Sequence, residues 1–191
     1  MNYKELFNRA LLLISSPAKA WEEILLDKDR HKVFSGFVYP LLGLVAFSVF
    51  LGTLFTHGWG GPQSFQIAMT RCCAVTIALF GGFYTSAYIL NGLSVWKFNL
   101  RDDLLQAQCL IGYSLVVTFS LKIITGLLPN FQIVSWFLQF YVVYIIWEGA
   151  RVFIKIDESK RLLFTLLASF FLLSTPFIIE FLFNKLVFIL N

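Results

Sequence analysis

Charged residues are scarce in this chain of 191 residues: Asp, Glu, Lys and Arg make up 14% of it, against about 25% in soluble domains. The formal net charge is +4, and the basic residues flank apolar runs instead of forming one exposed cluster, which argues against a nucleic-acid-binding protein. Hydrophobic residues make up 58% of the chain and aromatic residues 18%. This composition is typical of an integral membrane protein, whose first partner is the lipid bilayer.

The sequence also has few residues of the kinds that bind metals or form disulfides. Its three cysteines, Cys72, Cys73 and Cys109, lack Cys-x-x-Cys spacing and are interpreted as small apolar residues of helices. The two histidines, His31 and His57, lie in different flanking segments without zinc-binding spacing. A glycine-rich phosphate loop and a nucleophile paired with a base are also lacking. We therefore predict no catalytic residue, no cofactor and no metal site, and a protein that is not an enzyme.

Five apolar stretches are each long enough to cross a hydrocarbon layer about 30 Å thick as a helix. Helices are expected because the stretches are long and do not alternate, and because their backbone groups must be paired within each segment. The predicted transmembrane helices are Val33 to Phe55, Cys72 to Gly92, Leu105 to Leu127, Gln132 to Phe153 and Leu162 to Phe183. The predicted fold class is therefore an all-α integral membrane protein with a five-helix transmembrane domain over residues 33–191.

Residues 1–32 form a separate N-terminal segment on the cytoplasmic side or at the membrane interface. The stretch "YKELFNRALLLI" places apolar residues on one helical face and charged residues off it. A second helix is expected next, because Ser16 can cap free amides and Pro17 suits the first helical position. We predict one or two short amphipathic helices lying on the leaflet, with Trp21 at headgroup level. The alternative is that they pack on the protein's own loops.

The distribution of Lys and Arg predicts how the chain is oriented in the membrane. Six lie in the N-terminal segment, two in the loop after the second span and four around the end of the fourth span, which makes twelve of the 15. Only Arg71, Lys122 and Lys185 flank the other side. Because basic residues favour the cytoplasmic side, we predict a cytoplasmic N-terminus and, after five spans, an external C-terminus.

Small residues recur at intervals of four in the second span, at Ala74, Ala78, Gly82 and Ser86. Such a stripe allows helix backbones to approach closely, so it is interpreted as a packing face at the centre of the bundle, with a homo-oligomer interface as the alternative. Gly36 and Gly43 in the first span are expected to permit close approach in the same way. Pro40 is expected to bend that span.

Ionisable residues are absent from the predicted bilayer midplane, which argues against a proton or ion relay. Glu148 is shallow, because it lies three residues, or about 4.5 Å, from Arg151 at the edge of the fourth span. We interpret it as part of an interfacial ion pair with Arg151 or with a neighbour such as Arg101, holding the fourth span against the second loop. The alternative is a transport path lined by Glu148, Tyr113, Lys122 and Glu180. Near Glu180, Pro176 could open a small polar vestibule.

Three stretches carry a resemblance to a known family. They are "GLSVWKFNLRDDLLQAQCLIGYSLVVTF" from Gly92 to Phe119, "LLLISSPAKAWEEI" before the first span, and the closing "VVYIIWEGARVFIKIDESKRLLFTLLASFF". Together they resemble the Yip (Rab/Ypt-interacting protein) membrane family, including its bacterial members. The sequence departs from the eukaryotic members in lacking an "Asp-Leu-Tyr-Gly-Pro" element, and it has Val116 and Val117 where a proline often follows "GYSL".

The resemblance implies five spans, a cytoplasmic N-terminus and a role in membrane organisation or trafficking through membrane or cytoplasmic partner proteins. Rab binding is not carried over to this chain. We expect a non-enzymatic scaffold in a bacterial inner membrane. A small transporter or channel and a lipid-handling protein are the alternative functions.

Overall fold

The computed structural model describes residues 3–27, 29–59 and 61–190, and these residues form helices without any β-strand. Lys28, which contributes to the basic count of the N-terminal segment, lies outside the described residues. Four helical stretches are long and apolar enough to cross a membrane, and a bent pair makes a fifth if it is counted as one span. These stretches are Phe34–His57, Pro62–Phe98, Leu104–Leu127, Glu158–Ile189 and the pair Pro129–Leu138 with Tyr141–Ile154. The prediction of an all-α membrane protein is therefore confirmed, with four to five candidate spans.

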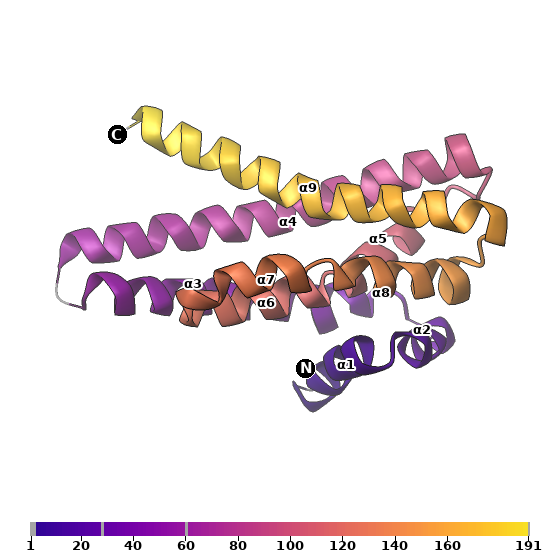
Figure 1. Ribbon diagram of the computed structural model, residues 1–191, viewed down its shortest axis with the longest axis horizontal. Helices are drawn as coiled ribbons and strands as arrows, with labels where there is room; N and C mark the ends of the chain where they lie inside the picture. The colour runs from indigo at the N-terminus through magenta and orange to yellow at the C-terminus, as the bar shows by residue number, and fades with distance from the viewer. Residues whose placement is uncertain (1–2, 28, 60, 191) are drawn as a thin grey trace.

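Two long helices form the centre of the molecule. The helix α4 (Pro62–Phe98) and the helix α9 (Glu158–Leu190) pack side by side, and the C-terminal part of α9 diverges from the bundle (Figure 1). At 37 residues α4 is about 55 Å long, so it extends past both ends of the predicted span Cys72 to Gly92. It ends at Asn99, whose left-handed backbone (φ 53°) lets the Leu100 amide donate to the Ser94 carbonyl.

The stripe of small residues on α4 is buried, and its last two members, Gly82 and Ser86, lie against α9. A Cβ atom on Gly82 would come within 2.5 Å of Pro176 Cγ, so only glycine fits opposite that ring. One turn further on, the Ser86 hydroxyl donates to the Phe171 carbonyl at 3.1 Å and lies 2.5 Å from the Thr175 hydroxyl. Close approach and interhelical hydrogen bonds therefore occur together at this contact.

A second close approach joins α3 (Tyr39–His57) to α6 (Val116–Leu127). A Cβ atom on Gly52 would collide with the Gly126 carbonyl, so the two backbones touch at this point. The prediction for Gly36 and Gly43 is wrong, because a Cβ atom on Gly43 would meet nothing within 4 Å and one on Gly36 only a side-chain carbon 3.9 Å away. Spacing alone did not identify the glycines that face a neighbouring helix.

The first span begins with a widened, π-helical turn over Phe34–Val38, directly before Pro40. Proline has no amide hydrogen, and its ring would clash with the carbonyl four residues earlier, here that of Gly36. A wider turn relieves this clash, and in it the Tyr39 amide donates to the Phe34 carbonyl. The effect of Pro40 is therefore a local widening that exposes Ser35 and Gly36.

The third and fourth predicted spans each consist of more than one helical segment. The third consists of α5 (Leu104–Ser114) and α6, which meet at Leu115. The fourth was predicted as one helix, but it consists of the turn η2 (Pro129–Phe131), α7 (Gln132–Leu138), α8 (Tyr141–Gly149) and a π-helical turn, η3 (Ala150–Ile154). A bend of 43° separates its two halves.

Two short helices precede the bundle, as predicted: α1 (Tyr3–Ser15) and α2 (Pro17–Leu26). Figure 1 shows them beside the half of the bundle that contains α5 and α8. The helix α2 contacts α8 and η3, and α1 contacts α6. Trp21 was expected on the membrane surface among the headgroups, but its side chain is 0% exposed and packs inside the bundle.

Candidate functional site

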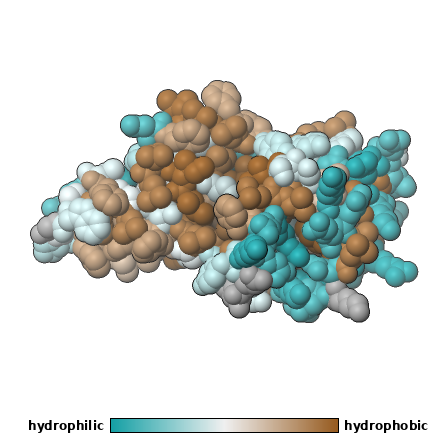
Figure 2. Space-filling view, turned by 90° about the horizontal axis from the view of Figure 1, so that it is seen from below, coloured by the Kyte–Doolittle hydropathy of each residue, from teal (hydrophilic) through white to brown (hydrophobic). Residues whose placement is uncertain are grey.

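Hydrophilic side chains gather at one end of the molecule. Figure 2 shows them at the end where α4 finishes and α9 begins, while hydrophobic side chains cover much of the rest of the visible face. This polar end contains α2 and the connections that precede α3, α5 and α9. We name it the basic end, because most of the Lys and Arg residues lie in these segments or in the helix ends that adjoin them.

Trp21 attaches the N-terminal helices to the basic end. Its indole N–H donates to the Ile145 carbonyl at 2.9 Å, and its ring lies 5.4 Å from that of Phe153. Gly149 provides the space, since a Cβ atom there would come within 2.8 Å of the indole. A buried Trp with its N–H satisfied combines a large apolar contact with one directional bond. Because of this anchor, α2 is a fixed part of the bundle.

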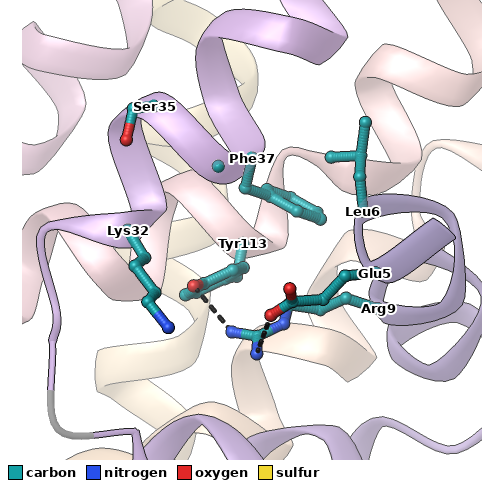
Figure 3. Close-up of a pocket in the computed structure, with 8 residues that line it drawn as sticks. Glu5, Leu6, Arg9, Lys32, Ser35, Phe37 and Tyr113 are labelled. Carbon is teal, nitrogen blue, oxygen red and sulfur yellow. Dashed lines mark hydrogen bonds and ion pairs between the residues drawn. The ribbon is translucent and has the colours of Figure 1, made fainter. Parts of the chain in front are cut away.

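A pocket of about 320 Å³ lies between α1, the π-helical turn before α3, and α5. Its volume is at the lower end of the range for small-ligand pockets, about 300 to 1,000 Å³. The lining combines charged, polar and apolar side chains with the backbone of the widened turn (Figure 3). It comprises Glu5, Leu6, Arg9, Lys32, Ser35, Gly36, Phe37 and Tyr113. We name it the α1–α3 pocket.

Arg9 connects three parts of the chain at this pocket. Its guanidinium donates to Asp27 at 2.5 Å and to the Tyr113 hydroxyl at 3.0 Å, and it lies 3.7 Å from Glu5 (Figure 3 draws Glu5 and Tyr113). Burial lowers the pKa of Arg9, but the hydrogen bond to Asp27 and the nearby charges more than offset this, so the pKa is raised. Arg9 is therefore a permanent cation.

Tyr113 is the most buried polar group of the pocket, with 3% of its surface exposed. Its ring lies 4.8 Å from that of Phe37 and meets Trp21 edge-on at 6.1 Å. These contacts fix the direction of the phenol, which points at Arg9 (Figure 3). The residue therefore joins the anchor of α2 to the α1–α3 pocket.

Glu148 lies nearby on α8, and it pairs with its own helix neighbour. Its carboxylate accepts from Arg151 Nε at 2.9 Å and from Nη2 at 2.6 Å. Glu148 is buried, while the Arg151 side chain is 47% exposed and reaches outward. Among the described residues no ion pair joins Glu148 to Arg101, which instead lines a small hollow beside Asp103 and Gln106. Of the two partners considered for Glu148, Arg151 is the one with which it pairs.

A second pocket, of about 510 Å³, lies near the other end of the bundle. Lys122 on α6 and Glu180 on α9 form an ion pair across it at 3.2 Å, and each side chain is about one-third exposed. Arg71, Asn184 and the hydroxyl groups of three threonines also line it. A hollow thus lies beside Glu180, but Pro176, which was expected to open it, is not among its lining residues and packs against Gly82. We name this hollow the outer pocket.

The four residues of the predicted transport path do not share one cavity. Lys122 and Glu180 line the outer pocket, Tyr113 lines the α1–α3 pocket, and Glu148 lines neither. Sequence reasoning missed Arg9 and Asp27, whose only signal was opposite charge flanking a short amphipathic segment. Among the described residues no cluster of three or more His, Cys, Asp or Glu side chains is placed to hold a metal ion.

Comparison with known proteins gives one match. A sequence model described as the Yip1 domain matches residues 11–179, which is most of the chain. The match begins in α1 and ends in α9, so it includes α2 with its Trp21 anchor. No curated protein and no solved structure matches the chain. With its apolar helices and a match over nearly its whole length, the chain is a multi-pass membrane protein that belongs to the Yip1 domain family.

Proposed function

We propose that this Yip1-domain protein is a non-enzymatic scaffold that organises or sorts membranes by binding partner proteins at its basic end. In this proposal the N-terminus is cytoplasmic, the C-terminus is external and the membrane is a bacterial inner membrane. The excess of Lys and Arg at one end supports the orientation. Membership of the family supports a role that depends on partners.

The observation that carries the proposal is the two-faced structure of α2. One face, with Trp21 and Ile24, is buried in the bundle, and the other presents Lys19, Glu22 and Glu23 to the outside. A helix that served only to bind lipid would direct apolar side chains outward. A charged outward face on a rigidly held helix is suited to a complementary protein surface, because fixed charges select partners and orient them.

Site-specific photo-crosslinking in cells tests this proposal. A photoreactive residue at position 23 is expected to give discrete protein adducts, whereas one at Gln63, at the far end of α4, gives none of the same adducts. Replacing Glu22 by Gln beside the probe should reduce adduct formation. Adducts to lipid alone at position 23, or the same protein adducts at both positions, would contradict the proposal.

The orientation has its own test. After replacement of the three native cysteines by serine, Glu23→Cys should react with a membrane-impermeant thiol reagent only after the cells are opened. Gln63→Cys should react in intact cells. The reverse pattern would invert the proposed topology without affecting the fold.

A transporter or lipid-handling function is favoured by one observation, the outer pocket with its ion pair between Lys122 and Glu180. A polar hollow at the level of apolar helices is a feature expected of a substrate site. Flux assays in reconstituted vesicles distinguish this function from the scaffold. A flux that requires Glu180, in a protein whose α2 gives no protein adducts, would make transport the better assignment.

A further inference from the structure

The α1–α3 pocket contains a hydrogen-bond donor that the described residues do not use. The Tyr113 oxygen accepts from Arg9, so its own proton must point elsewhere, and no acceptor for that proton lies among the described residues. The Tyr113 residue is only 3% exposed, and a hydroxyl that accepts one hydrogen bond can still donate another. The phenol therefore fits a ligand that brings an acceptor into the pocket.

Lys32 provides a second free donor. Figure 3 shows its ammonium group, the Tyr113 hydroxyl and the Arg9 guanidinium ending in the same region of the pocket. Lys32 forms no ion pair with any residue that the structure describes. Two cations and a phenol proton that converge in this way suit an oxyanion, because hydrogen bonds to a charged acceptor are the strong ones.

The local charges favour a ligand that carries both signs. Arg9 and Lys32 are matched in number by Glu5, which lines the pocket, and by Asp27, which binds Arg9. A phosphodiester alone would add one uncompensated negative charge. A phosphodiester joined to an ammonium group would leave the site balanced, and Glu5, at the exposed side of the pocket, is the acceptor for that ammonium.

The position of the pocket favours a lipid over a soluble phosphate. It opens beside the residues that begin the first span, and the adjacent helix α1 exposes a row of apolar side chains. This row is Tyr3, Phe7, Leu11 and Ile14, between 37% and 71% exposed. Apolar side chains of this kind lie at the boundary between headgroups and acyl chains.

We propose that the α1–α3 pocket binds the headgroup of an aminophospholipid such as phosphatidylethanolamine. Lys32, Tyr113 and Arg9 bind the phosphate oxygens, and Glu5 accepts from the ammonium group. This site is independent of whether a protein docks on α2, so the two proposals fail separately.

Native mass spectrometry of the full chain in mild detergent tests the site. Phosphatidylethanolamine, phosphatidylglycerol and phosphatidylcholine with identical acyl chains are added in turn, and the apparent Kd of the first bound lipid is measured. We expect phosphatidylethanolamine to bind most tightly. Tyr113→Phe and Lys32→Gln should each weaken it by about tenfold, the loss expected for one hydrogen bond to a charged acceptor. Glu5→Gln should weaken phosphatidylethanolamine by about threefold and should tighten phosphatidylglycerol slightly, because the site then carries one net positive charge.

Matched controls separate the site from general surface charge. Tyr88→Phe, at an exposed tyrosine of α4, and Lys97→Gln, at an exposed lysine near the same end, should leave the Kd unchanged. Equal affinity for the three lipids, or equal affinity of the native chain and the Lys32→Gln variant, would overturn the proposal. Displacement of the lipid by inorganic phosphate at concentrations similar to the lipid Kd would also overturn it, because the pocket would then recognise free phosphate. Lys32 is exposed, so its variant remains informative even if Tyr113→Phe does not fold.

Discussion

Replacing Trp21 by Ala is expected to detach α2 while the bundle remains folded. The indole is fully buried and contributes the one hydrogen bond from α2 to α8 that the described residues show, to the Ile145 carbonyl. The contacts of the ring with Phe153 and with Tyr113 are lost with it. The transmembrane helices keep their own contacts, and α1 keeps its hydrogen bonds with Tyr113 and Tyr141, so the loss falls on the attachment of α2.

The size of the effect follows from the burial of Trp21. A tryptophan side chain buries about 150–250 Å², which at about 25 cal/mol per Å² corresponds to about 4–6 kcal/mol. Measured truncations of buried Trp or Phe to Ala cost about 3–5 kcal/mol, so we expect about 4 kcal/mol. About 1 kcal/mol of this belongs to the indole N–H, which Trp21→Phe removes while it keeps most of the apolar contact.

Hydrogen exchange measured by mass spectrometry on the full chain in lipid nanodiscs is the assay. Loss of about 4 kcal/mol should speed exchange in α2 by up to about a thousandfold, with little change in α4 and α9. Trp96→Ala is the control, because Trp96 is 80% exposed and its loss should leave α2 protected. Unchanged protection of α2 in the Trp21→Ala variant would refute the reasoning and would show that the membrane surface holds the helix.

Three further substitutions test the bundle, and each is checked by thermal unfolding in detergent. Glu148→Gln removes the acceptor charge for Arg151, so it should lower the free energy of unfolding by about 1 kcal/mol, or lower expression, without abolishing a specific flux. A flux lost with the fold intact would contradict the anchor interpretation. Gly52→Leu should prevent α3 from touching α6 and cost more than about 3 kcal/mol, so a stable, correctly folded variant would disprove the backbone contact. Lys122→Met should cost less than about 1 kcal/mol, because its ion pair with Glu180 is one-third exposed, and a double-mutant cycle with Glu180→Gln measures the coupling directly.

Hydropathy predicted where the membrane helices lie, because transfer of apolar side chains into lipid decides which segments insert. The first predicted span, Val33 to Phe55, differs from the observed stretch Phe34–His57 by one or two residues at each end. The second was predicted too short, since α4 continues through polar residues on both sides of the apolar run. A hydropathy pattern detects the part of a helix within the membrane, and it carries no information on where the helix itself ends.

The residues of the candidate site were harder to predict, because its contacts join distant parts of the chain. Arg9 and Tyr113 are 104 positions apart, and Trp21 and Ile145 are 124 apart. Helical periodicity assigns a residue to a face of its own helix, but it does not say which helix that face meets. Trp21 shows the ambiguity: an amphipathic ring suits the membrane interface as well as a core that offers an acceptor, and here the Ile145 carbonyl is that acceptor.

The outward faces of the two N-terminal helices differ in polarity, and this difference predicts where the molecule meets the water boundary. The outward face of α1 is apolar, with Phe7 and Leu11 at least half exposed, whereas that of α2 carries Glu22 and Glu23. In the proposed placement α1 faces lipid where the charged face of α2 faces water, and we expect the boundary to pass close to Ser16 between them. The α1–α3 pocket is lined by α1 and would then lie at this boundary, the depth at which a phospholipid presents its phosphate. The apolar face of α1, the charged face of α2 and the paired charges of the pocket are thus all accounted for by one proposed placement in the membrane.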